Sequence, residues 1–445
     1  MPPAAHPPAA PGAWPLLGHL PQLIASPLDF FQRMHRYGPV VRIRLGTRPA
    51  YVVTRPELVR RLLVADYDLF DKGGPFFEKA RLLIGNGLIT CPAADHIRQR
   101  PLMQPAFNRS RLPHCSDIIR DAVTEVTGSW QPGQVIRLEE QMLRITALMT
   151  SRTLISAEQG LAAATQIATS LPNISRGLYW RTVIPGKLFP KLPLAVNRRF
   201  DRDMARVHSA IEQVVSHYRA TGGDQGDLLS TLVTAYEQDK QEADPQQAIH
   251  DQAVTVLTAG VDTTAATLVW ALRVLAQHPH IAERLLTELR EELDGRLPGY
   301  DDIPRLPYTQ RVLTETLRLY SPGWMISRVT TAEVDWNEAR IPAGADVFFS
   351  PYALHRDPAV YPDPGTFDPD RWAPERVTTE QRQGFLPFGG GRRKCIGEAL
   401  GTAEMLMTLA TVLSRWRLHH LPGSAKPIMR MTLMPPLTRV RVERL

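Results

Sequence analysis

The chain has 445 residues, of which 43% are hydrophobic and 22% are charged, a composition typical of a folded globular protein and not of a disordered one. Its net charge of +7 comes from scattered lysines and arginines that nowhere form a run of five or six, so we expect no nucleic-acid partner. Three cysteines, with no CxxC pair and no histidine cluster, argue against a disulfide framework or a zinc site and fit a reducing cytoplasm.

The N-terminal lead, residues 1–15, is rich in Pro and Ala and has neither a basic start nor an apolar run of about eighteen residues. We therefore expect no signal peptide and no membrane anchor. Residues 27–37 predict a short helix, and residues 40–45 and 50–54 predict two strands joined through Gly46.

Helical patterns dominate residues 56–277 and are interrupted by clusters of glycine and proline. These clusters are Gly73–Pro75, Gly85–Gly87, Pro185–Gly186 and Gly222–Asp224. Strand patterns return at residues 325–329, 346–350 and 438–442. Because no linker or repeat divides the chain, we predict one mainly α domain with small β-sheets, spanning residues 1–445.

One long helix is predicted from Asp244, which can cap its first turn, to about Gln277, a length of roughly 50 Å. Its middle, Ala259–Thr264, contains glycine, which costs about 1 kcal/mol in a helix, and polar residues that compete for backbone hydrogen bonds. We expect a gap in the helical ladder there, with Thr263 holding a hydrogen bond to oxygen and Asp262 linking it to solvent protons. The alternative is a solvated helix face on which Thr263 merely packs.

Two further features follow in the C-terminal half. Glu315 and Arg318 lie one helical turn apart, and such a pair alone is usually a surface salt bridge worth less than about 1 kcal/mol. The stretch 356–387 contains six prolines and little periodicity, and an ordered segment of this kind is usually functional.

The run Phe388-Gly-Gly-Gly-Arg-Arg-Lys-Cys395-Ile-Gly397 precedes an apolar stretch that predicts a helix over residues 396–413. The glycines let the backbone adopt positive φ and approach a flat ligand closely. Cys395 then lies near a helix N-terminus, where the dipole favours a thiolate, the form that binds iron. A lone buried, inert cysteine in a glycine-rich turn is the alternative.

This run resembles the haem-binding signature of the cytochrome P450 family, Phe-x-x-Gly-x-Arg-x-Cys-x-Gly, at every fixed position. The resemblance implies the single-domain P450 fold around heme b (iron protoporphyrin IX), with Cys395 as the axial thiolate ligand of the iron. Thiolate donation favours O–O bond cleavage. It also implies that Phe388 shields the sulfur and that Arg393 pairs with a haem propionate.

The same resemblance assigns roles to residues elsewhere in the chain. Asp262 and Thr263 match the acid and the alcohol of the family's oxygen-activation motif. His96 and Arg100, four residues apart on one helix face, and Arg328, on a strand after Glu-x-x-Arg, are expected to neutralise propionates. Each of these three is otherwise an ordinary surface charge.

Glu315, Arg318 and Arg371 resemble the family's structural triad behind the haem, whose role is folding and cofactor retention. In that family the substrate pocket is built from segments that lie far apart in the sequence. None of the side chains that we predict for the pocket wall here carries a charge. These are Phe76, Phe77, Ile84, Leu88, Leu178, Tyr179, Trp180, Trp324, Met325, Ile326 and Leu433. Such a wall suits a lipophilic ligand.

Short segments such as 341–346 and 350–355 are similar to terpene-oxidising bacterial members of the family, with sesquiterpene hydroxylases of the pentalenene oxygenase type the nearest. We therefore predict a cytoplasmic monooxygenase that hydroxylates or further oxidises a lipophilic molecule, a sesquiterpene, in secondary metabolism. Two alternatives are a peroxide-driven or isomerising haem-thiolate enzyme and a non-catalytic haem sensor.

The chain has no flavin or nicotinamide motif, so electrons must come from separate proteins. We expect a ferredoxin and a ferredoxin reductase. Arg392, Arg393 and Lys394 predict a basic face beside the cysteine for an acidic ferredoxin.

Overall fold

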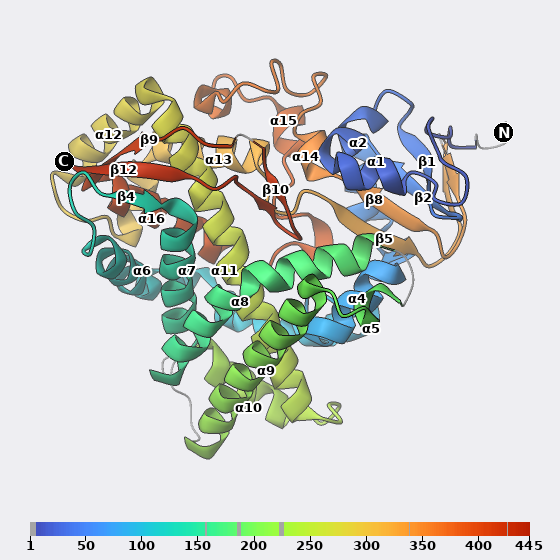
Figure 1. Cartoon of the computed structure of the whole chain (residues 1–445), viewed down its shortest axis with the longest axis horizontal. Coiled ribbons are helices and arrows are strands. Elements are labelled where there is room, and N and C mark those ends of the chain that lie inside the picture. Colours follow the sequence, from blue (N-terminus) through green and yellow to red (C-terminus); the bar gives the residue numbers. More distant parts are fainter. Residues whose placement is uncertain (1–5, 156–157, 185–187, 222–226, 338, 425) are drawn as a thin grey trace.

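The computed structural model describes residues 6–155, 158–184, 188–221, 227–337, 339–424 and 426–445. The predicted breaks at Pro185–Gly186 and Gly222–Asp224 lie outside these ranges. Helices dominate the described chain and the strands form small sheets, which confirms the predicted fold class (Figure 1).

The helices vary in length from single turns to one that crosses the molecule. They are α1 (Leu20–Ala25), α2 (Pro27–Met34), α3 (Pro56–Arg60), α4 (Gly74–Ile84), α5 (Ala93–Met103), α6 (Leu112–Thr127), α7 (Leu138–Leu154), α8 (Glu158–Val183), α9 (Ala195–Thr221), α10 (Leu228–Gln238), α11 (Pro245–Gln277), α12 (Pro279–Leu293), α13 (Pro307–Leu319), α14 (Pro351–Leu354), α15 (Thr379–Gly384) and α16 (Glu398–Leu413). A π-helical turn, η1 (Arg61–Ala65), follows α3.

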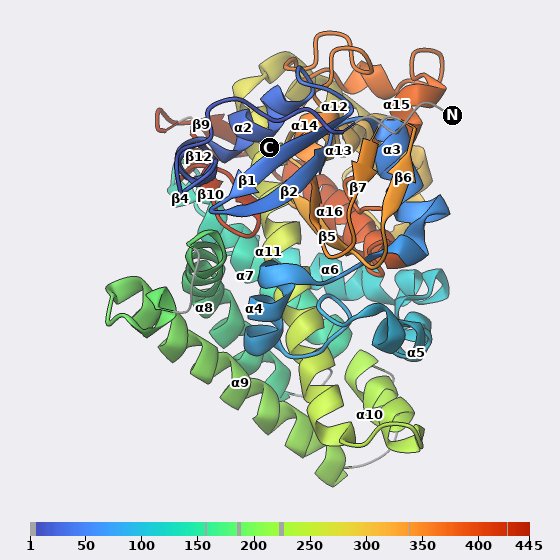
Figure 2. The same ribbon diagram turned by 90° about the vertical axis from the view of Figure 1, so that its right-hand side faces the viewer.

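The largest sheet lies near the N-terminus and has the order β1-β2-β8-β5-β3 (Figure 2). Its strands are β1 (Val40–Leu45), β2 (Arg48–Val53), β3 (Phe70–Asp71), β5 (Ile326–Thr330) and β8 (Asp346–Phe349). Neighbouring strands are antiparallel except β2 and β8, which are parallel. The sheet therefore brings the first seventy residues against a segment some three hundred residues later.

Three smaller sheets complete the β structure of the described chain. Their strands are β4 (Val135–Arg137), β12 (Arg439–Arg444) and β9 (Trp416–His420) in one sheet, β6 (Val334–Trp336) and β7 (Ala339–Ile341) in a second, and β10 (Ile428–Met429) and β11 (Leu433–Met434) in a third. The β10–β11 hairpin is short, and the turn between its strands consists of residues 430–432.

Helix α11 runs through the centre of the molecule, as Figure 1 shows. It begins as predicted: the Asp244 carboxylate accepts a hydrogen bond from the Gln247 amide at 3.1 Å, and Pro245 takes the first position. The helix is long and apolar enough to cross a membrane, but 78% of its most apolar window is buried inside the protein. Its apolar sequence therefore reflects a central place in the core.

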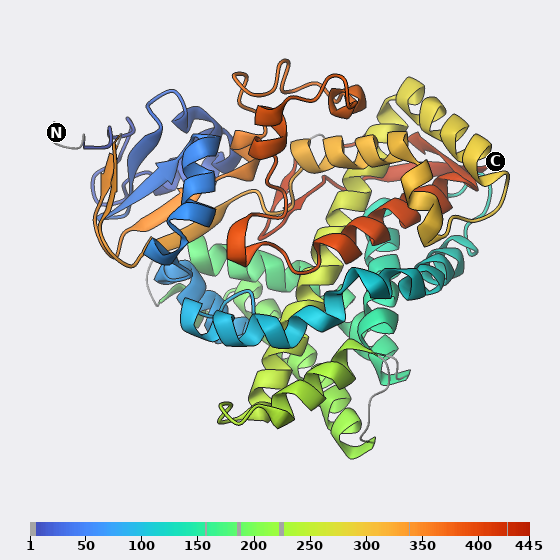
Figure 3. The ribbon, with the colours of Figure 1, turned by 180° about the vertical axis from the view of Figure 1, so that it is seen from behind.

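Helix α16 and the loop before it are visible from behind, in red and orange in Figure 3, close to the cyan helices. Helix α16 is hydrophobic on nearly all sides because it packs against both α6 and α11. This packing fixes the cysteine loop, residues 386–397, at one end of a buried helix.

Candidate functional site

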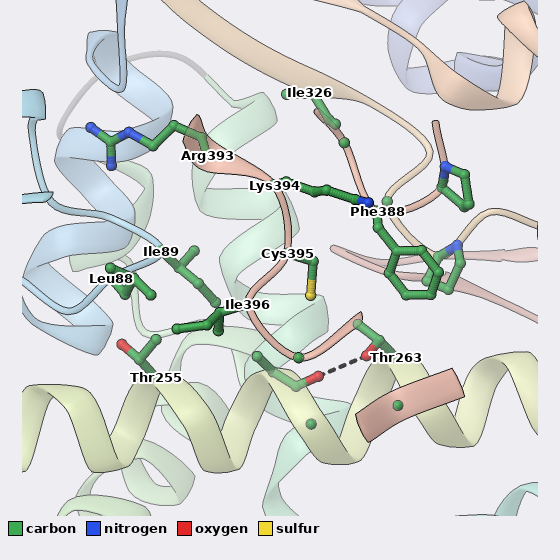
Figure 4. Close-up of a pocket in the computed structure, with 18 of the residues that line it drawn as sticks. Leu88, Ile89, Thr255, Thr263, Ile326, Phe388, Arg393, Lys394, Cys395 and Ile396 are labelled. Carbon is green, nitrogen blue, oxygen red and sulfur yellow. Dashed lines mark hydrogen bonds between the residues drawn. The ribbon is translucent and has the colours of Figure 1, made fainter. Parts of the chain in front are cut away.

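A cavity of about 470 Å³ lies between α11 and the cysteine loop. Figure 4 shows Cys395 with its sulfur directed toward the part of α11 that carries Thr263. All predicted site residues except Asp262 line this cavity. They are His96, Arg100, Thr263, Arg328, Phe388, Arg393 and Cys395. The fold thus brings α5, α11, β5 and the cysteine loop to one place.

The cysteine loop has a tight turn that only glycine permits. Gly391 has φ +64°, and a Cβ atom built on it would lie 1.8 Å from the carbonyl oxygen of Leu63 in η1. The Cys395 amide donates to the Phe388 carbonyl oxygen at 2.9 Å, which closes the loop and holds the thiol toward the cavity. Burial raises the pKa of the Cys395 thiol, and a hydrogen bond from the Gly397 backbone opposes this effect.

Five basic residues, which we call the cationic cluster, meet at one end of the cavity: Lys72, His96, Arg100, Arg328 and Arg393. Burial and the charge of Arg393 lower the pKa of Arg328 to about 10. Burial and neighbouring cations lower the pKa of His96 to about 3 and that of Lys72 well below its usual range. The cluster therefore has more positive charge than its surroundings balance.

The hydrogen bonds of the cationic cluster also indicate that it has too few carboxylate partners. Arg393 bonds Asp71 at 3.0 Å, whereas Arg328 donates to the carbonyl oxygen of Ser327 and Arg100 to that of Lys394. Within the described residues, neither Arg328 nor Arg100 has a carboxylate at ion-pair distance. An anionic ligand placed here would satisfy both.

Helix α11 supplies the opposite side of the cavity. Thr263 faces the cavity, and its hydroxyl donates to the Ala259 carbonyl oxygen at 2.8 Å (Figure 4). Asp262 lies behind this surface, where burial raises the pKa of its carboxyl and a hydrogen bond from Thr432 opposes the shift. The predicted gap in the helical ladder is wrong, because α11 is one continuous helix and the Thr263 hydroxyl donates to the Ala259 carbonyl oxygen within it.

The predicted ion network is buried, which confirms the grouping of Glu315, Arg318 and Arg371. Arg318 binds the Glu315 carboxylate with two hydrogen bonds of 2.8 and 2.7 Å, and both side chains are 0% exposed. Arg371 reaches the same carboxylate at 3.4 Å. The Trp372 indole is the third side chain that donates to this carboxylate, at 2.8 Å. The network lies away from the cavity and stabilises the Pro-rich stretch.

His355 connects this network to the cysteine loop. Its Nε2 accepts a hydrogen bond from the Leu386 amide at 2.9 Å, and the amide can only donate. Its Nδ1 must therefore carry the proton and donate to the Arg318 carbonyl oxygen, 3.1 Å away. Burial and the charge of Arg318 lower the pKa of His355 to about 3, so the ring is neutral as this pattern requires.

Comparison with known proteins identifies the family. The profile of the cytochrome P450 family matches residues 7–441. The chain belongs to the cytochrome P450 family. This P450 is 42% identical over 430 residues to cyclooctatin synthase of Streptomyces melanosporofaciens, covering 96% of this chain and 94% of that one. It is 38% identical over 428 residues to pentalenene oxygenase of Streptomyces avermitilis, covering 96% and 95%.

The fold agrees with this assignment. The crystal structure of the cytochrome P450DA heme domain superimposes with a TM-score of 0.87 and 26% identity, over 99% of this chain and 98% of that one. The protein is therefore a cytochrome P450 monooxygenase, and its family cofactor is a thiolate-ligated haem.

The residues of this P450 fit such a cofactor. A thiol whose pKa is raised by burial needs a nearby positive charge to remain a thiolate, and a ferric ion supplies it. The cationic cluster needs anions, and propionates supply them. Two cavity-lining glycines, Gly389 and Gly401, have no atom within 4 Å of an added Cβ, so they leave room beside a flat ring.

The predicted pocket wall is partly correct. Seven of its residues line the cavity: Phe76, Phe77, Leu88, Tyr179, Trp324, Met325 and Ile326. The other four pack in the hydrophobic clusters instead and do not line the described cavity: Ile84, Leu178, Trp180 and Leu433. Leu433 is 0% exposed because it packs in one of these clusters, where its amide donates to the Pro322 carbonyl oxygen and its own carbonyl oxygen accepts from the Trp270 indole.

Sequence reasoning missed three charged residues that line the cavity: Lys72, Glu404 and Arg430. Glu404 is fully enclosed in α16, and burial raises the pKa of its carboxyl to about 8. One signal was available for it, since Glu404 is the one carboxylate inside the apolar run 396–413, whose other carboxylate, Glu398, lies at its start. Lys72 and Arg430 lie in segments with no distinctive pattern, so their place was not predictable. The prediction that the cavity wall carries no charge is therefore incomplete.

The predicted basic face beside the cysteine also needs correction. The Arg393 side chain is 3% exposed and turns inward to Asp71, because that carboxylate and the Cys91 carbonyl oxygen bind it there. Arg392 and Lys394 remain on the surface, with exposed side-chain fractions of 66% and 46%. The surface charge at this loop is thus smaller than the sequence predicts.

Proposed function

We propose that this P450 oxidises a terpene, of the sesquiterpene class, at an unactivated carbon. The observation that carries the proposal is the largely apolar wall beside Thr263, which includes Phe76, Phe77, Trp324 and Met325. A hydrocarbon is held there mainly by burial, at about 25 cal/mol per Å². Relatives named for terpene oxidation, such as pentalenene oxygenase, support the terpene part of the proposal.

The roles of the site residues follow from their charges and positions. Cys395 binds the iron through its sulfur, and Phe388 shields that sulfur. Arg393 is one of the residues that bind the propionates. His96, Arg100 and Arg328 bind and orient the propionates with the remainder of the cationic cluster. A haem held by these residues would supply the chemistry of O2 activation, in which two electrons from the redox partner and two protons allow one oxygen atom to enter the substrate and the other to leave as water.

Protons have to reach the cavity during this reaction. Thr263 presents its hydroxyl to the cavity, and Asp262 lies next to it in α11. A raised pKa in the Asp262 carboxyl suits a group that binds and releases a proton. We assign Asp262 to proton uptake and Thr263 to holding the proton at its Oγ1 atom.

Electrons come from a ferredoxin and its reductase. The exposed Arg392 and Lys394 lie in the cysteine loop. The exposed Arg61 begins η1, against which that loop packs, and the exposed Arg60 ends α3 just before it. Such a basic surface attracts an acidic redox protein, and added salt weakens the encounter. We further infer that residues 1–445 act as one domain in the bacterial cytoplasm.

The test combines a spectrum with a reconstituted reaction. Reduced, CO-bound protein should show the red-shifted band of thiolate-ligated haem, and Cys395→Ser should abolish this band. With O2, ferredoxin, ferredoxin reductase and a panel of sesquiterpene hydrocarbons and alcohols, we expect oxygenated products. An intact thiolate band with no product from any terpene would refute the proposal. Product formation that needs only peroxide would refute the role of the ferredoxin.

A further inference from the structure

Arg430 is a charged residue in the otherwise largely apolar wall of the cavity. It occupies the first position of the turn between β10 and β11 and lines the cavity together with Met431. The Trp324 indole donates to the Arg430 carbonyl oxygen at 3.2 Å, and the Leu433 amide donates to the Pro322 carbonyl oxygen at 3.1 Å. The backbone on both sides of the turn is therefore fixed.

The Arg430 side chain is not satisfied by the protein. Its Nε is buried and has no hydrogen-bond partner among the described residues. It also has no described carboxylate at ion-pair distance, although Asp262 is close enough to favour its charge and Arg176 opposes it. A buried donor without a partner costs on the order of 1–3 kcal/mol, so a ligand that accepts a hydrogen bond here is favoured.

Asp262 defines what kind of acceptor fits. Its Oδ1 is buried and also lacks a described partner, while a hydrogen bond from Thr432 satisfies part of the carboxylate. Because Asp262 partly offsets the charge of Arg430, the ligand does not need to be an anion. A neutral oxygen atom, as in an alcohol or a ketone, supplies the missing acceptor without bringing a second negative charge near Asp262.

We propose that the substrate already carries an oxygen atom, which accepts a hydrogen bond from Arg430 while an apolar part of the same molecule meets the reaction site. This inference rests on the proposed terpene oxidation and narrows its substrate class to oxygenated terpenes. It also gives the reaction a place in a sequence. A hydroxylation, or a cyclisation that ends with the addition of water, must supply the substrate of this P450.

The experiment compares two ligands of one carbon skeleton, a terpene hydrocarbon and its alcohol, by the spin-state change of the haem-loaded protein. We expect the wild type to bind the alcohol roughly ten-fold more tightly than the hydrocarbon, since a hydrogen bond to a charged donor has about this value. Arg430→Met should remove the preference by weakening only the alcohol. Arg430→Lys, which keeps the charge, should restore part of it.

Met431→Leu is the matched control, because Met431 follows Arg430 in the turn and also lines the cavity but offers no donor. It should change both affinities by a similar factor and leave the preference intact. The thiolate band of each variant shows that haem is bound. Equal affinity of the wild type for both ligands, or a preference that survives Arg430→Met, would overturn this inference and leave terpene oxidation standing. If no such pair from the terpene panel shifts the spin state or yields product, both proposals fail.

Discussion

The neutral state of His355 predicts a specific sensitivity to acid. His355 is buried with a pKa of about 3, whereas the unfolded chain carries a histidine with its ordinary value of 6.5. Below that value the unfolded state binds a proton that the folded state does not, so the free energy of unfolding falls as pH falls. At about pH 5 the free energy of unfolding has fallen by roughly 2 kcal/mol, because each pH unit below the histidine pKa of the unfolded chain costs about 1.4 kcal/mol.

The effect can be isolated with His355→Asn. The asparagine amide can still donate toward the Arg318 carbonyl oxygen but does not titrate and leaves the Leu386 amide without its partner. At neutral pH we expect this variant to lose about 1–3 kcal/mol of stability and part of its thiolate band, because Leu386 begins the cysteine loop. Between about pH 7.5 and pH 5, however, the free energy of unfolding of this variant should fall by roughly 2 kcal/mol less than that of the wild type.

Urea denaturation followed by circular dichroism and by the reduced CO spectrum measures both quantities. His96, whose pKa is also lowered to about 3, contributes acid sensitivity of the same sign, so only the difference between wild type and variant reports on His355. His280→Asn, which replaces an exposed histidine at the start of α12, is the matched control. If wild type and His355→Asn lose equal stability on acidification, the neutral-ring argument is wrong.

Other substitutions test the network, the proton path and the pocket wall. Glu315→Gln leaves two buried guanidinium groups without their carboxylate, so we expect a loss of about 3–5 kcal/mol in a denaturation curve and a lower haem-to-protein ratio. Thr263→Ala should keep the thiolate band but consume more reducing equivalents per product, and unchanged coupling would remove Thr263 from the proton path. The Lys79 ammonium in α4 donates to the carbonyl oxygens of Arg181 and Ile184 at the C-terminal end of α8, and so joins two helices that contribute to the pocket wall. In spin-state titrations Lys79→Met should therefore weaken substrate binding several-fold, and Lys79→Arg should weaken it less.

Local signals explain which parts of the fold were predictable. The predicted start of the long helix is correct because Asp244 and Pro245 fix it with two neighbouring residues. The predicted strand at residues 40–45 coincides with β1, whose pattern of buried and exposed residues is visible in the sequence. By contrast, β3, β10 and β11 contain two residues each, too few for any periodic pattern. Their pairing depends on distant parts of the chain.

The same distinction holds for the site. The cysteine loop was predictable because five residues with fixed spacing lie in one segment of ten. The cationic cluster was only partly predictable, since Lys72 shows no sequence signal and reaches the cavity through the packing of β3 against β5. The direction of the Arg393 side chain depends on Asp71, more than three hundred residues earlier in the chain. Long-range contacts of this kind leave no trace in local spacing.

Charge explains two different parts of the cavity wall. Buried cations without partners destabilise the folded protein, so a chain that contains them favours ligands that supply acceptors. The cationic cluster contains several like charges and needs anions, which is why it fits a cofactor with two carboxylates. Arg430 is a single cation whose charge Asp262 already balances in part, and a neutral oxygen atom is enough. One physical rule therefore assigns different partners to the two features, the haem to the cluster and an oxygen atom of the substrate to Arg430.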